Sequence, residues 1–522
     1  MTTAVLGLNL GQDAAAALFV DGELVAAVEQ ERFDADRHSA AFPTDAVRFV
    51  LAQAGLDVKA LAGLAVGDDR ITEADRAALA ALGLPEPFPV PHALAHAEGA
   101  FASSGFASAA VLVADGHAHG DAVAIFHADA RGVVQLAGFG CAQSPGDFYS
   151  RATALCGLAT RSGQEGKLMG LAPWGTAVDA AYVHAAAEPS DAASIAPAVP
   201  DAPLRPPVLP EALMASTTPH EPFGPASRAL AFAAQREIER FMLDAARRAF
   251  ALTGARRLCL AGGVALNCNA NAAIAALPGL EALHIQPAAN NAGTAAGAAA
   301  HFLRRRGIAP VVREQVRLGP DLSDTDIAGA VGRAVREGRV HARCVADAAA
   351  EAAARIAAGE VIGWCHGRAE FGPRALGNRS IVALPDTAAR RDRVNAIKRR
   401  EAWRPLAPSV LAECAADWFV DARPSPHMLL TFKVRPEKRL AVPAIVHVDG
   451  SARVQTVTAR DNPRYHALIS EVARLTGLPL VLNTSLNTRS KPMVLTASDC
   501  IDCLLDSGLD AAFIGDWLVL PG

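Results

Sequence analysis

Aromatic residues are scarce in this sequence: they make up 5% of its 522 residues, whereas 51% of the chain is hydrophobic. Alanine dominates the apolar positions, and this favours helices with small side chains packed closely on a sheet. Such a composition is typical of a soluble α/β protein. A chain of 522 residues is also long enough for two or three domains, each with its own core.

Other features are missing too. No apolar run approaches the roughly 20 residues that span a bilayer, and the N-terminus has no charged segment before a cleavage site, so we expect a cytoplasmic protein without membrane association. The net charge of -5 argues against nucleic acid as a partner. Nine cysteines without a secretory signal predict reduced thiols. Cys500 and Cys503 are expected to be buried thiols of a helix rather than a metal or redox pair.

The N-terminal stretch "LGLNLGQDAAAALFVDGELVAAVEQERF" alternates apolar, β-friendly segments with short polar interruptions. It predicts three strands, over residues 4–9, 14–20 and 24–28. Gln12 and Asp13 form a tight loop between the first two strands, and Asp21-Gly22 forms a hairpin turn. The pattern fits an ordinary hairpin. It also fits the start of an actin-like nucleotide-binding domain, in which backbone N–H groups face phosphate.

Two later stretches repeat the strand–loop–helix pattern. "RLCLAGGVALNCNAN" is a strand that runs into Gly262-Gly263 and then Asn267 before a helix, and "HIQPAANNAGTAAGAAAHF" has a polar loop at Asn290 and Asn291. Paired glycines let a backbone pass close to a nucleotide, and a helix N-terminus favours an anion. We therefore expect a ligand cleft and take Gly262, Gly263 and Asn267 as candidate cofactor-binding residues.

Histidines and a carboxylate lie between these regions. His92 and His96 are four residues apart on an expected helix, so both imidazoles lie on one face and can share a metal, although such histidines also occur as plain surface or core residues. "AVLVADGHAHGD" is a strand that ends at Asp115, with His117 and His119 on its exit loop. A carboxylate at a strand tip suits a third metal ligand or a partner of a magnesium nucleotide.

Two changes of composition mark the organisation of the chain. Prolines interrupt any regular element over about residues 176–225, which predicts a surface insertion to which we assign no chemistry. Apolar periodicity weakens over residues 310–345, which predicts a boundary between two domains. We therefore expect domains over residues 1–335 and 345–522.

Basic and polar residues are densest in the C-terminal part. They occur in "GRAEFGPRALGNRS", "VNAIKRREAWRPLAPSV", "HVDGSARVQTV" and "LPLVLNTSLNTRSKP". Any one of these clusters fits a solvated basic face. Several of them at strand ends and Gly/Pro loops, in a chain of negative charge, predict a focused site for a small polyanionic ligand. The residues of interest are Arg368, Arg374, Arg379, Lys398, Arg399, Arg400, Arg404, His447, Arg453, Asn483, Thr484, Ser485 and Asn487.

Taken in order, the motifs resemble those of the O-carbamoyltransferases of antibiotic and nodulation-factor biosynthesis, which include the tobramycin and cephamycin enzymes. The resemblance covers nearly the whole chain: "GLNLGQDAAAAL", "EQERF", "HALAHAEGAF", "ADG", "GKLMGLAPWG", "LCLAGGVALNC", "PAANNAGTAAGAA", "EFGPRALGNRS", "KRREAWRPLAPSV", "HVDGSARVQTV" and "NTSLN". It implies an α/β fold, with an actin-like (ASKHA) first domain similar to the tRNA threonylcarbamoyl-transfer proteins and a YrdC-like second domain.

The resemblance also implies two coupled reactions. In the YrdC-like domain, carbamoyl phosphate and ATP would yield carbamoyl-adenylate, a step that needs cations around the phosphates. The positions that match the family's residues for this step are Arg374, Lys398, Arg404, Arg453 and Ser485, and Asn483 lies beside them. In the actin-like domain, the carbamoyl group would move to a small-molecule acceptor, and AMP would leave.

For the second step the family uses a metal held by the equivalents of His92, His96, Asp115 and an aspartate, with a first-loop histidine as base. This chain has Asn291 at the aspartate position, Gln12 beside Asp13 at the histidine position, and Lys491 where glutamate is common. Gln12 cannot accept a proton. The loss of charge at Asn291 predicts a weakly held metal, with iron or zinc favoured over magnesium by the two imidazoles.

Three alternatives stay open. His117 or His119 takes over proton transfer, the acceptor is a neutral amine that needs little base, or the second half-reaction has been lost or changed. The sequence therefore predicts an ATP-dependent carbamoyltransferase of specialised metabolism with an unknown hydroxyl or amine acceptor. The alternative is a divergent member that makes or binds carbamoyl-adenylate for another transfer, or a non-catalytic partner of an active paralogue. A homodimer is left open as the assembly.

Overall fold

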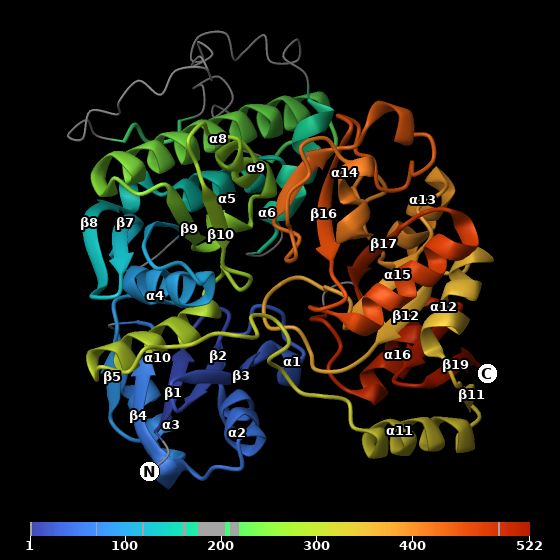
Figure 1. Cartoon of the computed structure of the whole chain (residues 1–522), viewed down its shortest axis with the longest axis horizontal. Helices are drawn as coiled ribbons and strands as arrows, with labels where there is room; N and C mark the ends of the chain where they lie inside the picture. Colours follow the sequence, from blue (N-terminus) through green and yellow to red (C-terminus); the bar gives the residue numbers. More distant parts are fainter. Residues whose placement is uncertain are drawn as a thin grey trace. The chain divides into compact units, whose positions relative to one another are not determined.

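The computed structural model describes residues 3–68, 70–116, 120–159, 163–175, 204–208, 219–488 and 491–522. The chain divides into two compact units, the first made of residues 1–30 and 38–315 and the second of residues 31–37 and 316–522 (Figure 1). Among the described residues, no helix combines the length and apolarity needed to cross a membrane.

The first unit contains two five-stranded sheets, ordered β3-β2-β1-β4-β5 and β10-β9-β6-β7-β8. Their strands are β1 Ala4–Asn9, β2 Ala15–Val20, β3 Glu23–Glu29, β4 Leu61–Val66, β5 Pro87–Pro89, β6 Ala109–Ala114, β7 Asp121–Asp129, β8 Gly132–Gly140, β9 Arg257–Ala261 and β10 Ala282–Ile285. In each sheet the first strand is central: it pairs antiparallel with the second and parallel with the fourth. The two sheets therefore repeat one topology.

This duplication confirms the predicted α/β class and is the arrangement expected of an actin-like domain. The three N-terminal strands expected from sequence are confirmed as β1, β2 and β3. Asp21 and Gly22 join β2 to β3 with φ of 49° and 84°. Two successive positive φ angles are typical of the type I′ turn, whose twist matches that of the flanking strands.

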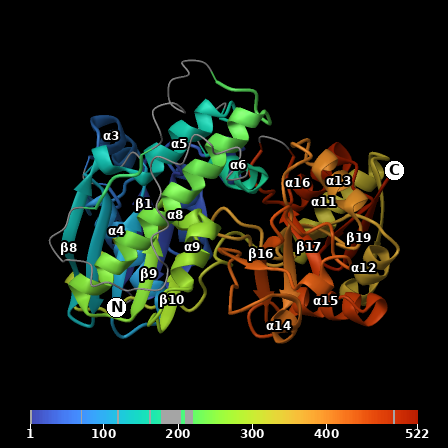
Figure 2. The ribbon, with the colours of Figure 1, turned by 90° about the horizontal axis from the view of Figure 1, so that it is seen from above.

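Helices pack between and around these sheets (Figure 2). The helices of the first unit are α2 Thr44–Gln53, α3 Glu73–Ala81, α4 His92–Ser104, α5 Pro145–Leu155, α6 Glu165–Leu171, α8 Pro225–Thr253, α9 Cys268–Ala275 and α10 Gly293–Arg305. Helix α10 packs on β1, β2 and β4 and also on α4, which in turn packs on β6 and β9. The α4–α10 contact is very close, because a Cβ at Gly297 would lie 1.7 Å from the carbonyl oxygen of Ala95.

The second unit is built on a nine-stranded mixed sheet, ordered β11-β19-β18-β12-β13-β17-β14-β16-β15. Its strands are β11 Val340–Cys344, β12 Ile362–Cys365, β13 Arg379–Ala383, β14 Ala407–Leu411, β15 Leu430–Lys433, β16 Ser451–Val457, β17 Leu480–Ser485, β18 Ala511–Ile514 and β19 Trp517–Pro521. Its helices are α1 Glu31–Asp34, α11 Asp324–Arg336, α12 Ala348–Ala357, α13 Ala388–Ile397, α14 Ala415–Trp418, α15 Pro463–Thr476 and α16 Ala497–Ser507.

Helices α12 and α15 pack together and cover a core that includes Trp364, Tyr465 and Phe513. The nine cysteines are free in the structure, and Cys500 and Cys503 are buried in α16 as expected. Most of the predicted proline-rich insertion lies outside the described residues; its described parts, residues 204–208 and 219–224, contain no helix or strand.

Candidate functional site

Two polar residues and two glycines of the first unit lie where parallel strands end. Asn9 is the last residue of β1, Gly67 follows β4, Asp115 follows β6 and Gly262 follows β9. The carboxyl ends of parallel strands, where neighbouring chains turn apart, are the usual ligand sites of α/β sheets. The local sequence therefore delivers these residues to positions suited to a ligand.

His92, His96 and Asp115 meet as the spacing predicted, and we call them the metal triad. Helix α4 begins at His92 and places both imidazoles one turn apart, with ring centroids separated by 4.7 Å at an interplanar angle of 84°. Each Nε2 atom lies 3.2 Å from Asp115 Oδ2. The other carboxylate oxygen, Oδ1, accepts N–H bonds from Gly116 at 2.8 Å and Gly263 at 3.1 Å.

The ring of His92 is oriented by the backbone. Its Nδ1 lies 3.2 Å from the carbonyl oxygen of Gly67, an acceptor, so Nδ1 carries the proton and Nε2 turns toward Asp115. Two lone pairs, on Nε2 and Oδ2, then face each other and require a proton or a metal ion between them. Burial alone would lower the pKa of the His92 imidazole, but its hydrogen bond to Asp115 raises it.

His96 is fully buried, and within the described part of the chain neither of its ring nitrogens has a partner in hydrogen-bonding geometry. Burial lowers the pKa of His96 and so favours the neutral ring that binds metals. Burial would raise the pKa of the Asp115 carboxyl, but the two imidazoles hold it well below its ordinary value. The ligand atoms of the triad all lie within 4.8 Å of one another, so the residues fit a divalent metal.

The fourth expected ligand, Asn291, lies beside this triad. Its side chain faces His96 and has a small raising effect on the pKa of that ring, against the larger lowering effect of burial. An amide oxygen is a neutral donor, so the position offers no negative charge to a metal. His117 and His119, the alternative bases, lie outside the described residues.

The Gly262-Gly263 turn approaches the triad, whereas its predicted contact with a cofactor stays a prediction. Gly262 has a φ of 87°, and the next N–H, from Gly263, reaches Asp115. Asn267 has different surroundings. As the N-cap of α9, its side-chain oxygen accepts a hydrogen bond from the backbone N–H of Ala270. Its amide also exchanges two hydrogen bonds of 3.1 Å with the buried amide of Gln235. The Asn267 side chain is thus committed to the local fold.

The first loop is held by Asn9. The Asn9 amide donates to the carbonyl oxygens of Gln12 and Asp13, both at 2.9 Å, while Gln12 itself is exposed. Asp13 is buried, and its Oδ1 lies 2.7 Å from Nδ1 of His38. His38 was not among the residues chosen from sequence. Its position five residues after the end of the "EQERF" motif was the one available signal.

In the second unit, Lys398 directly follows α13, and its side chain reaches the end of β17. Its ammonium group donates to the backbone oxygen of Ser485 at 2.5 Å and to that of Asn487 at 2.9 Å, and it contacts both side-chain oxygens as well. Burial and the neighbouring Arg400 guanidinium hold the pKa of Lys398 well below its ordinary value. Three of the predicted polar residues, Lys398, Ser485 and Asn487, therefore form one hydrogen-bonded cluster.

Arginines crowd around this lysine, and we call Lys398, Arg400, Arg404 and Arg453 the cation cluster. Burial lowers the pKa of Arg404, although Glu401 at 3.6 Å opposes this effect. Burial, Arg404 and Arg453 together hold the pKa of Arg400 well below its ordinary value. Arg37, from the short N-terminal segment of this unit, repels Lys398 and Arg404 further and was not foreseen from sequence. Buried like charges favour an anion as ligand.

The loop that carries Arg374 is organised by a buried carboxylate. Glu370 Oε1 accepts backbone N–H bonds from Leu376 at 2.8 Å, Asn378 at 2.9 Å and Arg379 at 3.2 Å. A carboxylate that accepts several backbone bonds fixes the course of a loop strongly. Glu370 therefore positions the segment of Arg374.

The same loop lies against one face of the sheet. Asn483 on β17 and Gln455 on β16 donate to carbonyl oxygens of residues 371–378 at 3.2 and 2.9 Å. Side chains two apart on a strand share a face, so Ser485 and Arg453 lie on the face that this loop covers. The structure thus brings the predicted residues of this region onto one face, with Asn483 engaged in holding the loop.

Arg368 and Arg379 differ from the sequence interpretation. Arg379 is the first residue of β13 rather than a loop residue, is fully buried, and donates to the carbonyl oxygens of His366 and Gly367 at 3.0 Å. Arg368 donates to the carbonyl of Gly319 at 3.0 Å. Both guanidiniums satisfy backbone carbonyls, because glycine- and proline-rich turns leave carbonyls without partners of their own.

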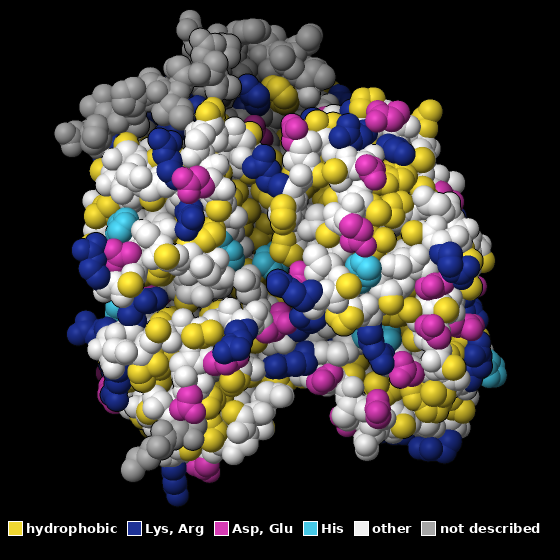
Figure 3. Space-filling model, viewed as in Figure 1, with side chains coloured by type: hydrophobic (Ala, Val, Ile, Leu, Met, Phe, Trp, Pro, Cys, Tyr) yellow, Lys and Arg dark blue, Asp and Glu magenta, His cyan; other side chains and the backbone are white. Residues whose placement is uncertain are grey.

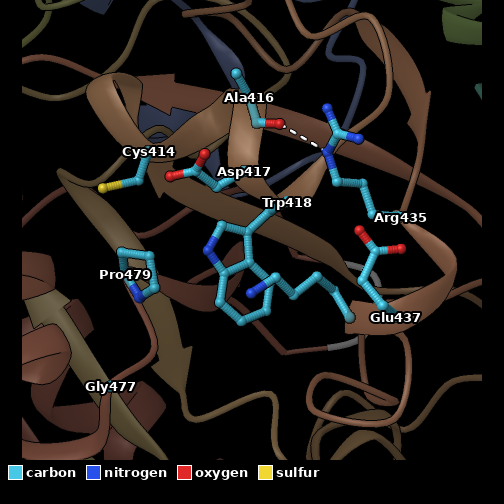
Figure 4. Close-up of a pocket in the computed structure, with 9 residues that line it drawn as sticks. Cys414, Ala416, Asp417, Trp418, Arg435, Glu437, Gly477 and Pro479 are labelled. Atoms are coloured by element: carbon cyan, nitrogen blue, oxygen red, sulfur yellow. Dashed lines mark hydrogen bonds between the residues drawn. The ribbon is translucent and has the colours of Figure 1, made fainter.

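A separate hollow of about 460 Å³ lies on the second unit, lined by Cys414, Trp418, Arg435, Lys438 and Pro479 among others (Figure 4). The Lys438 ammonium lies 4.9 Å from the Trp418 ring centroid. The hollow contains none of the predicted site residues. On the face shown in Figure 3, basic and acidic side chains are interspersed, in contrast to the one-sided charge of the buried cation cluster.

Comparison with known proteins gives one family. The family model described as "Carbamoyltransferase N-terminus" matches residues 4–73, 70–188 and 214–300, and "Carbamoyltransferase C-terminus" matches residues 353–520. Nodulation protein NolNO of Sinorhizobium fredii is 35% identical over 97% of this chain and 78% of its own length. The 3'-hydroxymethylcephem-O-carbamoyltransferase of Streptomyces clavuligerus is 36% identical over 65% of this chain and 62% of its own length. Among solved structures, HypF of T. kodakarensis matches 60% of this chain and 48% of its own with a TM-score of 0.36 and 14% identity.

Proposed function

The chain belongs to the carbamoyltransferase family, and from this premise we propose that it is an ATP-dependent enzyme that makes carbamoyl-adenylate and passes the carbamoyl group to a small-molecule acceptor. The second unit would form the carbamoyl-adenylate, and the first unit would perform the transfer. The acceptor is proposed to be a hydroxyl or amine compound of specialised metabolism, as the printed activity of the cephem relative suggests.

The observation that carries the proposal is the cation cluster. Lys398 is buried and Arg400 and Arg404 are partly buried near it, and desolvation lowers the pKa of each. A protein tolerates such crowding where a polyanion binds, because the anion removes both the repulsion and part of the desolvation cost. ATP and carbamoyl phosphate together present that charge.

The first step would join two anions. Water cleaves carbamoyl phosphate to carbamate and inorganic phosphate, a carbamate oxygen then attacks the α-phosphorus of ATP, and pyrophosphate leaves with the electron pair of the broken P–O bond. Negative charge on the phosphorus oxygens grows during this step, so guanidiniums fixed in a buried site lower the barrier. Arg404 and Arg453 would contact the phosphates, Arg374 would reach them from its loop, and Lys398 would hold the end of β17 in place.

The second step would use the first unit. An acceptor oxygen or nitrogen attacks the carbamoyl carbon, the bond from that carbon to the phosphate oxygen breaks, and AMP leaves with the electron pair. His92, His96 and Asp115 would hold a divalent metal, iron or zinc by the chemistry of the donors, which would polarise the carbamoyl carbonyl when bound. Asn291 adds no charge to these ligands, so the metal should be weakly held.

The test is a two-stage assay with the full chain. Pyrophosphate exchange into ATP that requires carbamoyl phosphate is expected for the first stage, and acceptor-stimulated AMP release is expected for the second. Absence of exchange would refute adenylation. Exchange without AMP release to any hydroxyl or amine acceptor would favour the second candidate, a member that makes carbamoyl-adenylate for another transfer, which the exposed and non-basic Gln12 supports.

A further inference from the structure

We propose that His38, oriented by Asp13, is the general base that deprotonates the acceptor hydroxyl in the first unit. This assignment rests on the proposed carbamoyl transfer. It replaces the histidine that the family resemblance places at the position of Gln12. An amide cannot accept a proton at neutral pH, whereas an imidazole can.

The two side chains are in direct contact. Asp13 Oδ1 lies 2.7 Å from His38 Nδ1, and the backbone of the next residues adds a second link, since Ala14 N–H donates to the Ser39 carbonyl at 3.0 Å. A carboxylate on Nδ1 fixes the tautomer that leaves proton transfer to Nε2. The His38 side chain is 20% exposed, against 7% for Asp13, although its Nε2 atom is buried.

The backbone at both residues is held in an uncommon conformation. Asp13 has a φ of 58° and His38 a φ of 62°, both in the left-handed region. For residues other than glycine this conformation costs energy and occurs often at functional sites, where the surroundings impose it. Here it turns two segments that are far apart in the sequence so that their side chains meet.

The imidazole is confined from a third segment. A Cβ at Gly163, whose φ is 78°, would lie 2.0 Å from His38 Nε2. Any larger residue at position 163 would therefore displace the ring. Gly163 thus packs directly against the nitrogen that the proposal assigns to proton transfer and fixes the position of the ring.

The pair is coupled to the metal triad through two buried residues. Asn9 holds the Asp13 carbonyl, and the Thr294 hydroxyl lies 3.1 Å from Asn9 Oδ1 and 2.7 Å from the Asn291 carbonyl oxygen. The Asn291 side chain in turn contacts His96. Hydrogen bonds thus link the first loop to Asn291, whose side chain faces His96 of the triad, within one unit.

The assigned step balances as a simple proton transfer. His38 Nε2 takes the proton from the acceptor O–H as the oxygen bonds to the carbamoyl carbon, and AMP leaves with the electrons of the broken C–O bond. The imidazolium is stabilised by the Asp13 carboxylate and then loses its proton to solvent. A positioned base of this kind contributes about 10²- to 10⁴-fold to a rate.

The experiment uses the full chain with zinc or ferrous ion, ATP and carbamoyl phosphate, and two probe acceptors. Water is the hydroxyl probe, read as AMP release without added acceptor; hydroxylamine, which is a neutral nucleophile near pH 8, is read as hydroxyurea. His38→Gln removes the base. His127→Gln is the matched control, since His127 is 27% exposed and lies 3.9 Å from the Asp129 carboxylate in the same unit.

We expect His38→Gln to lower AMP release to water about 100-fold or more, with pyrophosphate exchange within about twofold and hydroxyurea formation within about threefold of wild type. Asp13→Asn should lower AMP release to water at least about tenfold through loss of orientation. Gly163→Ala should lower it as well.

Four results would overturn the assignment. His38→Gln could leave AMP release to water unchanged, or it could lower AMP release and hydroxyurea formation equally. His127→Gln could lower AMP release as much as His38→Gln does, or the wild-type protein could exchange pyrophosphate but release no AMP to water. Absence of pyrophosphate exchange in the wild-type protein is a different outcome. It refutes the proposed function itself, and the base assignment falls with it.

Discussion

In the first unit one carboxylate, Asp115, faces two imidazoles, whereas in the second unit the cations Lys398, Arg400 and Arg404 lie near one another and Glu401 is the carboxylate that acts on the two arginines. The charge of the triad is close to balanced, and one proton or metal ion between the imidazoles and the carboxylate completes it. The cation cluster is far from balanced, and its excess charge calls for a ligand with several negative charges.

This difference in charge predicts that substitutions in the two sites have effects of different size. The positions that the family resemblance assigns to adenylation, Arg374, Lys398, Arg404, Arg453 and Ser485, all carry the expected residues, while the transfer site departs at Gln12 and Asn291. Loss of one cation from a crowded phosphate site should therefore be severe. Changes around the triad should act in smaller steps on metal affinity.

The largest effect is expected for Arg404→Ala. Loss of one charge-assisted contact that strengthens in the transition state costs about 2–4 kcal/mol, roughly two to three decades of rate. Carbamoyl phosphate-dependent ATP–pyrophosphate exchange measures the loss. Arg460→Ala is the control, because that side chain is 92% exposed and pairs with Asp461. Equal exchange rates in wild type and Arg404→Ala would remove Arg404 from the site.

A change in the triad tests the other side of the comparison. His92→Ala should weaken zinc or iron binding at least about 100-fold, since even outer-shell partners of a metal are worth about 10- to 100-fold. Equilibrium metal titration of the full chain is the measurement. His284→Ala serves as control, because that ring bonds Ser103 instead. Similar metal affinities for both variants would show that the triad does not hold the ion.

The charge imbalance of the second unit predicts stabilisation by pyrophosphate. At 100 times its Kd a ligand adds about 2.7 kcal/mol, which for a unit of about 200 residues raises the Tm by roughly 5–10 °C. Tryptophan fluorescence can follow this unit, because Trp364, Trp403, Trp418 and Trp517 belong to it and Trp174 to the other. A Tm shift that persists unchanged in Arg404→Ala would contradict the role of the cluster.

Sequence reasoning located the triad because two strong local rules act there. Two histidines four apart on a helix share a face, and a buried strand delivers Asp115 to its carboxyl end. The duplicated strand–loop–helix pattern follows from similar short-range signals. These elements require no knowledge of distant contacts, and β6, β9 and α4 formed where expected.

His38 and Arg37 escaped prediction for the opposite reason. They lie in a short polar segment after β3 without apolar periodicity, and His38 meets Asp13 through a left-handed backbone conformation that no sequence pattern specifies. Arg368 and Arg379 show the converse error. A basic residue in a glycine-rich turn looks the same whether it binds a ligand or a backbone carbonyl, and only the fold reveals which.

The smallest effect is expected for Asn291→Asp, which restores the charge that the triad lacks beside His96. An added carboxylate at position 291 gives the donor set a second negative charge beside that of Asp115 and should tighten zinc or iron binding about tenfold, or about 1.4 kcal/mol. Asn269→Asp adds the same charge at the start of α9 and is the control, because a screened charge outside the ligand shell acts weakly. Equal metal affinities in Asn291→Asp, Asn269→Asp and wild type would show that position 291 is not part of the metal site. In that case the metal affinity would be set by His92, His96 and Asp115 alone.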